Sequence, residues 1–205
     1  MTARKAKAIV LGVAMFLAAP DFCLAQEPSA AGSYSRYHGD GIDNVLEYVP
    51  TAAVFGLKML GVKAESSWKR QLTVSAVSFA IDAGVTLALK HTVHEMRPDG
   101  TDNRSFPSGH TAIAFCGATM LMHEYRDVSP WIGVAGYAVA TGVAVDRVRR
   151  NRHHWGDVAA GAAVGVLSAE AGYWIGGLIL GKNRKRNDMS LSVVPTGVEF
   201  RMAIQ

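Results

Sequence analysis

Six chemically active side chains are concentrated in three short segments of this 205-residue chain. They are Lys90, Arg97, His110, Arg147, His153 and Asp157. A phosphoryl group in transfer spreads negative charge over its equatorial oxygens, so an enzyme assists it mainly by positioning and charge stabilisation. Cations, two histidines and a carboxylate supply these functions without a metal or another cofactor. The set therefore predicts metal-independent phosphoryl transfer.

The anion would be held by side-chain charge and by a helix start. Arginine forks match the geometry of phosphate oxygens, and the expected cations are Lys90, Arg97 and Arg147. Pro107 predicts the opening of a helix at Ser108 and Gly109. The free N–H groups and the positive dipole of that helix start would face the anion.

The two histidines are expected to take different roles. A neutral imidazole is a competent nucleophile, and His153 would attack phosphorus to form a phosphohistidine. Asp157 stands four residues later, where it can hold the other ring nitrogen. His110 would protonate the leaving oxygen and then activate water.

In these segments the chain resembles the type 2 phosphatidic acid phosphatase superfamily, which includes bacterial acid phosphatases and vanadium haloperoxidases. The family motifs are Lys followed after six residues by Arg-Pro, then Pro-Ser-Gly-His, then Ser-Arg followed after five residues by His and after three more by Asp. They correspond here to Lys90 to Pro98, Pro107 to His110, and Arg147 to Asp157. The resemblance implies a helical phosphatase and the same site residues.

One position departs from the family pattern. Asp146 stands where the family usually has the serine before the third-motif arginine. This change removes a hydroxyl and places a carboxylate near the expected phosphate. We expect Arg149 or Arg150 to neutralise it.

Residues 1–25 have the pattern of a cleaved secretory signal peptide. Three early cations precede an apolar run and the small-residue ending Cys23-Leu24-Ala25. Cleavage would remove three cations and one aspartate, which lowers the formal net charge from +4 to +2. Only Cys116 would remain, which excludes an intrachain disulfide.

The rest of the chain predicts an all-α bundle of about five apolar helices, at 45–62, 71–89, 108–122, 131–145 and 158–181. An extended arm, 26–44, precedes the phosphatase domain 45–186, and the tail 187–205 has the alternation of a short β-hairpin. Segments 71–89 and 158–181 are long and apolar enough to cross a bilayer. We expect an envelope protein of the inner membrane with its site facing the periplasm; a soluble periplasmic protein is the alternative.

The sequence also suggests two other interpretations, a metal site and a nucleic-acid-binding surface. His91, His94 and Glu95 suggest a metal site, but their order and number do not match a zinc motif, and no metal is expected. The arginines between 147 and 152 would ordinarily suggest nucleic acid, yet a secretory leader and apolar helices exclude that partner. A lipid headgroup is the expected contact of Arg149, Arg150 and Arg152.

The sequence therefore predicts a phosphatase acting on a phosphorylated lipid. Candidates implied by the resemblance are phosphatidic acid, phosphatidylglycerol phosphate, undecaprenyl pyrophosphate and the phosphates of lipid A. Two alternatives remain open: an acid phosphatase acting on small phosphoesters, and a lipid-binding membrane protein without turnover.

Overall fold

The computed structural model describes residues 42–181, 189–194 and 197–202. The expected leader 1–25, residues 26–41 of the arm and the basic cluster 182–186 lie outside these residues.

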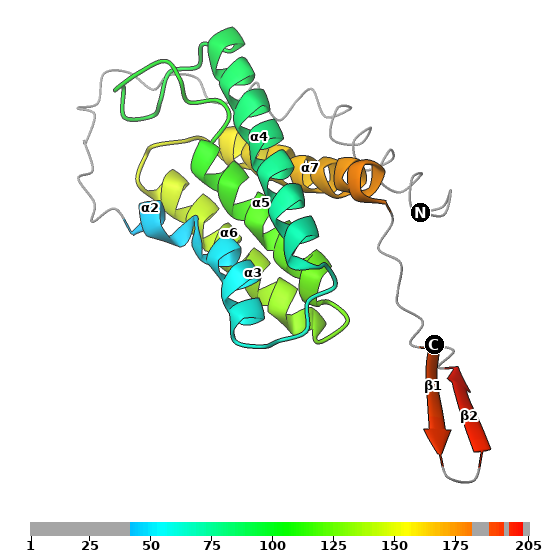
Figure 1. Ribbon diagram of the computed structural model, residues 1–205. Helices are drawn as coiled ribbons and strands as arrows, with labels where there is room; N and C mark the ends of the chain where they lie inside the picture. The colour runs from blue at the N-terminus through cyan, green and yellow to red at the C-terminus, as the bar shows by residue number, and fades with distance from the viewer. Residues whose placement is uncertain (1–41, 182–188, 195–196, 203–205) are drawn as a thin grey trace.

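The described chain forms a helical bundle, which confirms the expected all-α fold class (Figure 1). The helices are α2 Asp43–Leu46, α3 Val49–Met59, α4 Trp68–Thr92, α5 Gly109–Tyr125, α6 Pro130–Arg149 and α7 Trp155–Leu180. The helix expected over 45–62 is divided into α2 and α3, and Pro50 stands in the first turn of α3. Within the described residues the first helix thus begins at Asp43, inside the segment expected to be an extended arm.

Two strands follow the helices. β1 Met189–Val194 pairs antiparallel with β2 Gly197–Met202, with Met189 opposite Met202 and Val194 opposite Gly197. This is the short hairpin that the alternating tail predicted.

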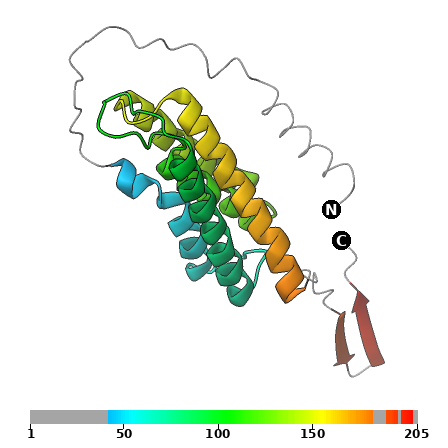
Figure 2. The ribbon, with the colours of Figure 1, turned by 90° about the horizontal axis from the view of Figure 1, so that it is seen from above.

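Helix α5 lies at the centre of the bundle, where it contacts α3, α4, α6 and α7 (Figures 1 and 2). Its sequence is rich in alanine, glycine and threonine, and most of its residues are buried. Small side chains on every face allow neighbours to pack around it from all sides. The residue at its N-terminus is therefore fixed relative to the whole bundle.

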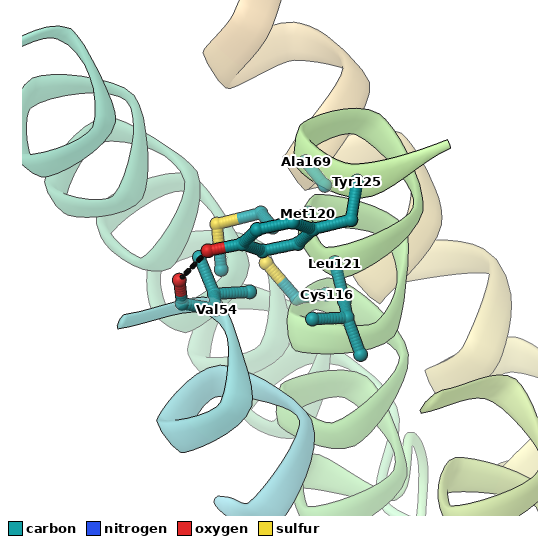
Figure 3. Packing of buried hydrophobic residues seen from close by; sticks show 6 residues of the cluster. All are labelled: Val54, Cys116, Met120, Leu121, Tyr125 and Ala169. Atoms are coloured by element: carbon teal, nitrogen blue, oxygen red, sulfur yellow. Dashed lines mark hydrogen bonds between the residues drawn. The ribbon is translucent and has the colours of Figure 1, made fainter. Parts of the chain in front are cut away.

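The core between α3 and α5 combines apolar packing with paired polar groups. Val54, Met120 and Tyr125 are buried there together with Cys116 (Figure 3). The Tyr125 hydroxyl donates to the Val54 carbonyl oxygen at 2.7 Å, and Gln71 Nε2 donates to the same oxygen at 3.0 Å. This carbonyl is satisfied by two helices other than its own, which stabilises α3 against α4 and α5.

Glycines bring α7 against its two neighbours. A Cβ on Gly161 would collide with the Ser108 carbonyl oxygen, and one on Gly165 with the Ala112 carbonyl oxygen, both in or next to α5. A Cβ on Gly172 would collide with the Ser78 hydroxyl on α4. These close approaches hold the start of α7 beside the start of α5.

We predict that Gly165→Ala destabilises the protein whereas Gly142→Ala does not. The new methyl at 165 meets α5 backbone, including Cys116 N at 2.8 Å, and overpacking of this kind costs about 1–3 kcal/mol. Gly142 has open space around its Cβ position, so alanine there should stabilise α6 by about 0.5–1 kcal/mol. Thermal unfolding of both variants in one detergent measures the difference. Equal unfolding midpoints would contradict the packing described for α5 and α7.

Candidate active site

The three sequence motifs meet at one end of the bundle. The loop after α4, the start of α5 and the connection between α6 and α7 lie there, and α2 lies beside them (Figures 1 and 2). The Ser108 backbone N–H donates to the Asp157 carbonyl oxygen at 3.0 Å and so ties the second motif to the third.

His153 and Asp157 form a buried pair. His153 is 2% exposed, and its Nδ1 lies 3.4 Å from Asp157 Oδ2. This distance is long for a hydrogen bond, as is common in catalytic sites without substrate. Because Nδ1 faces the carboxylate, Nε2 is the ring nitrogen left for chemistry. Burial, assisted by the charges of Arg147 and Arg97, lowers the pKa of His153, which favours the neutral ring of a nucleophile.

Asp157, which precedes the expected span 158–181, is held in its charged form. It accepts hydrogen bonds from the Ser105 hydroxyl and from the His154 backbone N–H, the latter at 2.8 Å. Both hydrogen bonds favour the charged form of the carboxyl group. The carboxylate is thus ready to orient His153.

The cations of the first motif border the same space. Lys90 Nζ donates to the Pro107 carbonyl oxygen at 2.7 Å and to the Arg104 carbonyl oxygen at 3.0 Å. Arg97 Nε donates to Asp102 Oδ1 at 2.8 Å, while its Nη1 is buried with no hydrogen-bond partner among the described residues. That buried donor requires an acceptor, and a phosphate oxygen would provide one.

The start of α5 completes an anion cradle. Ser108 is the buried N-cap, and its hydroxyl oxygen accepts from Thr111 Oγ1 at 3.0 Å instead of capping a backbone N–H. The first amides of an α-helix, here from Gly109 onward, have no carbonyl partner within the helix. An oxyanion could bind these amides and the Ser108 hydroxyl together.

His110 stands in the first turn of α5 and is contacted from α2. Its Nε2 lies 2.7 Å from Asn44 Oδ1 and 3.8 Å from Glu47 Oε1. Burial and then the charge of Arg147 lower the pKa of His110 to about 4, against the opposing effect of Asp43. Without substrate the ring is therefore neutral at neutral pH.

Arg147 is bound by a carboxylate that the sequence had not indicated. Its Nη1 donates to Asp43 Oδ2, and Arg150 Nη1 donates to Asp43 Oδ1 at 2.7 Å. Burial alone would raise the pKa of Asp43, but the two arginines lower it below its ordinary value. This buried ion triplet attaches α2 to the end of α6.

The unusual Asp146 is neutralised as expected. Arg149 Nη2 lies 3.2 Å from its Oδ1, and Arg150 Nε lies 2.9 Å from its Oδ2. The aspartate thus helps to hold the arginine pair at the end of α6.

These contacts revise the expected headgroup arginines. The Arg150 side chain is only 9% exposed because it lies between Asp43 and Asp146. Arg152 Nη1 donates to Asp99 Oδ2 at 2.6 Å and so holds the loop after α4. Arg149 has the most exposed side chain of the three, at 71%, although it also pairs with Asp146.

Residues 71–179 match the family model described as the PAP2 superfamily. The chain belongs to the PAP2 superfamily. It is 46% identical over 150 residues to a lipid A 1-phosphatase of Porphyromonas gingivalis, an alignment that covers 70% of this chain and 34% of that protein. This PAP2 chain thus spans about a third of the length of its curated relative.

A solved structure of Aquifex aeolicus LpxE has a similar fold. The TM-score is 0.50 at 22% identity, and the match covers 64% of this PAP2 chain and 82% of that one. At this identity the likeness concerns the fold alone.

Several residues at the PAP2 site had no role in the sequence-based interpretation. They are Asp43, Asn44, Glu47, Ser105 and His154. Ser105 lies two residues before Pro107, and this proximity was its only signal. Asp43 and Asn44 precede an apolar segment as an N-terminal cap would, which gave no hint of a contact with residue 147.

We predict that Arg150→Gln impairs the PAP2 site while Arg149→Gln leaves it intact. Removing Arg150 leaves the buried Asp43 with one cation, and an incompletely satisfied buried charge costs about 1–3 kcal/mol. Arg149 is exposed, and its loss should cost within about 0.5 kcal/mol. Unfolding midpoints and turnover of a soluble phosphoester measure both effects. Equal losses in the two variants would contradict the buried triplet.

We also predict that anion binding raises the pKa of His110. The empty site holds that pKa at about 4 through burial and Arg147, and a bound phosphate dianion would offset that positive charge. Anion binding is then accompanied by proton uptake, so phosphate affinity should increase as pH falls towards the pKa of the bound form. NMR titration of labelled histidine, assigned with His110→Asn, measures the pKa with and without phosphate. A pKa that does not move on saturation with phosphate would contradict the shared location of His110 and the anion.

Proposed function

We propose that this protein is a metal-independent phosphatase that hydrolyses a phosphomonoester on a lipid. The observation that carries the proposal is the buried His153–Asp157 pair beside the buried Nη1 of Arg97, an unpaired donor. His153, Arg97 and Arg147 are close enough for their charges to act on one another. The proposed nucleophile and the proposed anion-binding arginines therefore lie in the same part of the structure.

In the first step His153 Nε2 attacks phosphorus, and the bond from phosphorus to the lipid oxygen breaks. Asp157 holds Nδ1 and stabilises the positive charge that develops on the ring. His110, protonated once the anion is bound, gives its proton to the departing alkoxide. The products are the lipid alcohol and a phosphohistidine.

In the second step water hydrolyses the phosphohistidine. Neutral His110 takes a proton from water as the oxygen attacks phosphorus, and the bond to His153 Nε2 breaks. Inorganic phosphate leaves and His153 is again neutral. The guanidinium groups of Arg97 and Arg147 bind the phosphoryl oxygens through both steps.

A membrane lipid as substrate is supported by the outer faces of α4 and α7. Both helices are long and apolar enough to span a bilayer, and only 28% of each apolar window is buried inside the protein. The core helix of a soluble protein would be mostly buried. Both helices have their motif-bearing ends at the same end of the bundle, so the site would lie at one membrane face.

Two exposed tryptophans on α7 are separated by about the thickness of the hydrocarbon layer of a membrane. Trp155 and Trp174 are both exposed and stand nineteen residues apart. At 1.5 Å per residue this separation is about 28 Å, close to the hydrocarbon thickness of about 30 Å. Tryptophan prefers the two membrane interfaces. We infer an inner-membrane location with the site facing the periplasm.

The phosphates of lipid A are the substrate that we favour, because the relative from Porphyromonas gingivalis is a lipid A 1-phosphatase. The bond that breaks is a phosphomonoester in phosphatidic acid and phosphatidylglycerol phosphate and a phosphoanhydride in undecaprenyl pyrophosphate, but all three present a terminal phosphoryl group. The anion site recognises that group, so the lipid body would determine the choice among them.

We predict that purified protein releases phosphate from lipid A in mixed micelles and that His153→Ala abolishes this release. Loss of the nucleophile should lower turnover by at least about a thousandfold. The variant needs an unfolding check because His153 is buried. Phosphate release and mass spectrometry of the lipid measure the result.

Matched controls separate the candidate functions. Activity should survive exhaustive chelation and fall with vanadate, because cations of the protein hold the anion. His154→Gln should retain turnover, since the hydrogen bond that His154 donates to Asp157 comes from its backbone N–H. Hydrolysis of small phosphoesters without any of the four lipids would favour the acid phosphatase. Folded wild-type protein that binds lipid A without turnover would favour the non-catalytic alternative.

A further inference from the structure

Three potential metal ligands lie together beside the His153–Asp157 pair. They are Glu95, His154 and Asp157, and one ligand atom from each lies within 4.8 Å of the others. His154 Nδ1 is 3.1 Å from Glu95 Oε1 and 3.5 Å from Asp157 Oδ2.

The two separations from His154 Nδ1 are compatible with the coordination shell of a small tetrahedral cation. Zinc binds nitrogen and oxygen ligands at about 2.0–2.1 Å, and tetrahedral angles then place neighbouring ligand atoms about 3.3 Å apart. The two measured separations lie on either side of that value. One imidazole and two carboxylates also form a ligand set that suits zinc better than magnesium or calcium, which prefer six or more oxygens.

Unpartnered atoms at the cluster provide a second, independent observation. Asp157 is fully buried, yet its Oδ1 has no hydrogen-bond partner among the described residues. Nδ1 of His154 is also buried, and its contacts among the described residues are the ion-pair distances to Glu95 Oε1 and Asp157 Oδ2 given above. Buried polar atoms normally have a hydrogen-bond partner. The unpartnered oxygen of this cluster can therefore still bind a cation.

The backbone holds the ligands in place. His154 and Asp157 belong to the same helix start, where the His154 N–H donates to Asp157 Oδ2 at 2.8 Å. The Glu95 carbonyl oxygen accepts from the Ser105 N–H at 2.9 Å, which fixes the third ligand beside them. Glu95 and His154 are each about one-third exposed, so an ion can enter from solvent.

We propose that Glu95, His154 and Asp157 form an inhibitory binding site for a zinc-class divalent cation. The inhibition rests on the proposed function, because a cation on Asp157 would withdraw the negative charge that supports His153. His153 would then be a weaker nucleophile. The site differs from the His91, His94 and Glu95 group considered from the sequence, since the structure pairs Glu95 with His154.

Binding tests the site without relying on turnover. The metal-free full chain in detergent is titrated with zinc by calorimetry and with cobalt(II) by visible absorption, which reports tetrahedral coordination. Wild type should bind one ion per chain through this cluster. Glu95→Gln and His154→Gln should each weaken zinc affinity at least about tenfold, because even outer-shell changes at metal sites cost that much. The control His91→Gln/His94→Gln should bind as tightly as wild type.

Inhibition is measured in the same proteins, each relative to its own rate without metal. Zinc should inhibit wild type and the control at concentrations that match binding, and should inhibit the two cluster variants at least about tenfold less effectively. The site would be overturned if folded Glu95→Gln and His154→Gln bound zinc as tightly as wild type. It would also be overturned if only the control variant lost zinc affinity. Zinc bound at the cluster without inhibition would overturn its inhibitory role. Binding that depends on the cluster in a chain without phosphatase activity would leave the site standing and refute the proposed function.

Discussion

The close contact between the starts of α5 and α7 is the constraint on which the site depends. A backbone hydrogen bond joins Ser108 to Asp157, and Gly161 lies where any side chain would strike the Ser108 carbonyl. The anion-binding helix start and the carboxylate behind the nucleophile are thus parts of one backbone unit. Their relative position does not rely on flexible side chains, which lowers the entropy that must be lost when the reacting geometry forms.

Charge balance at the site is achieved by pairing its arginines with acidic residues. Arg97 has Asp102, Arg147 has Asp43 and Arg152 has Asp99. This pairing allows several cations to occupy a partly buried space, where unpaired charges would be costly. Burial, together with the positive charge of Arg147, lowers the pKa of both histidines, which favours their neutral forms. A bound anion would oppose that positive charge and so favour the protonated form of His110.

The sequence predicted the helices and the three motifs because both kinds of signal are local. Hydrophobic segments of sufficient length form helices, and the spacing from His153 to Asp157 places both on the same side of a helix start. The division of the first expected helix was missed although Pro50 stands within it, because mostly apolar residues continue on both sides of that proline. The partners of the arginines were missed for a different reason. Asp43 lies 104 residues before Arg147 in the chain, and no local pattern relates the two. Arg150 and Arg152 stand in a basic run typical of a surface, and only the fold brings Asp43 and Asp99 to them.

The contact of Gly172 with Ser78 has a consequence for behaviour in lipid. Apolar helices in a bilayer gain little from mutual burial, so α4 and α7 need interlocking shapes to stay aligned. α4 carries Lys90 towards its end, and α7 carries Asp157 at its start. If the two helices slid along each other, the cation would move relative to the carboxylate. Because the glycine contact opposes sliding, a thinner or thicker membrane should tilt α4 and α7 as a pair. The distance between Lys90 and Asp157 would then stay the same when the composition of the membrane changes.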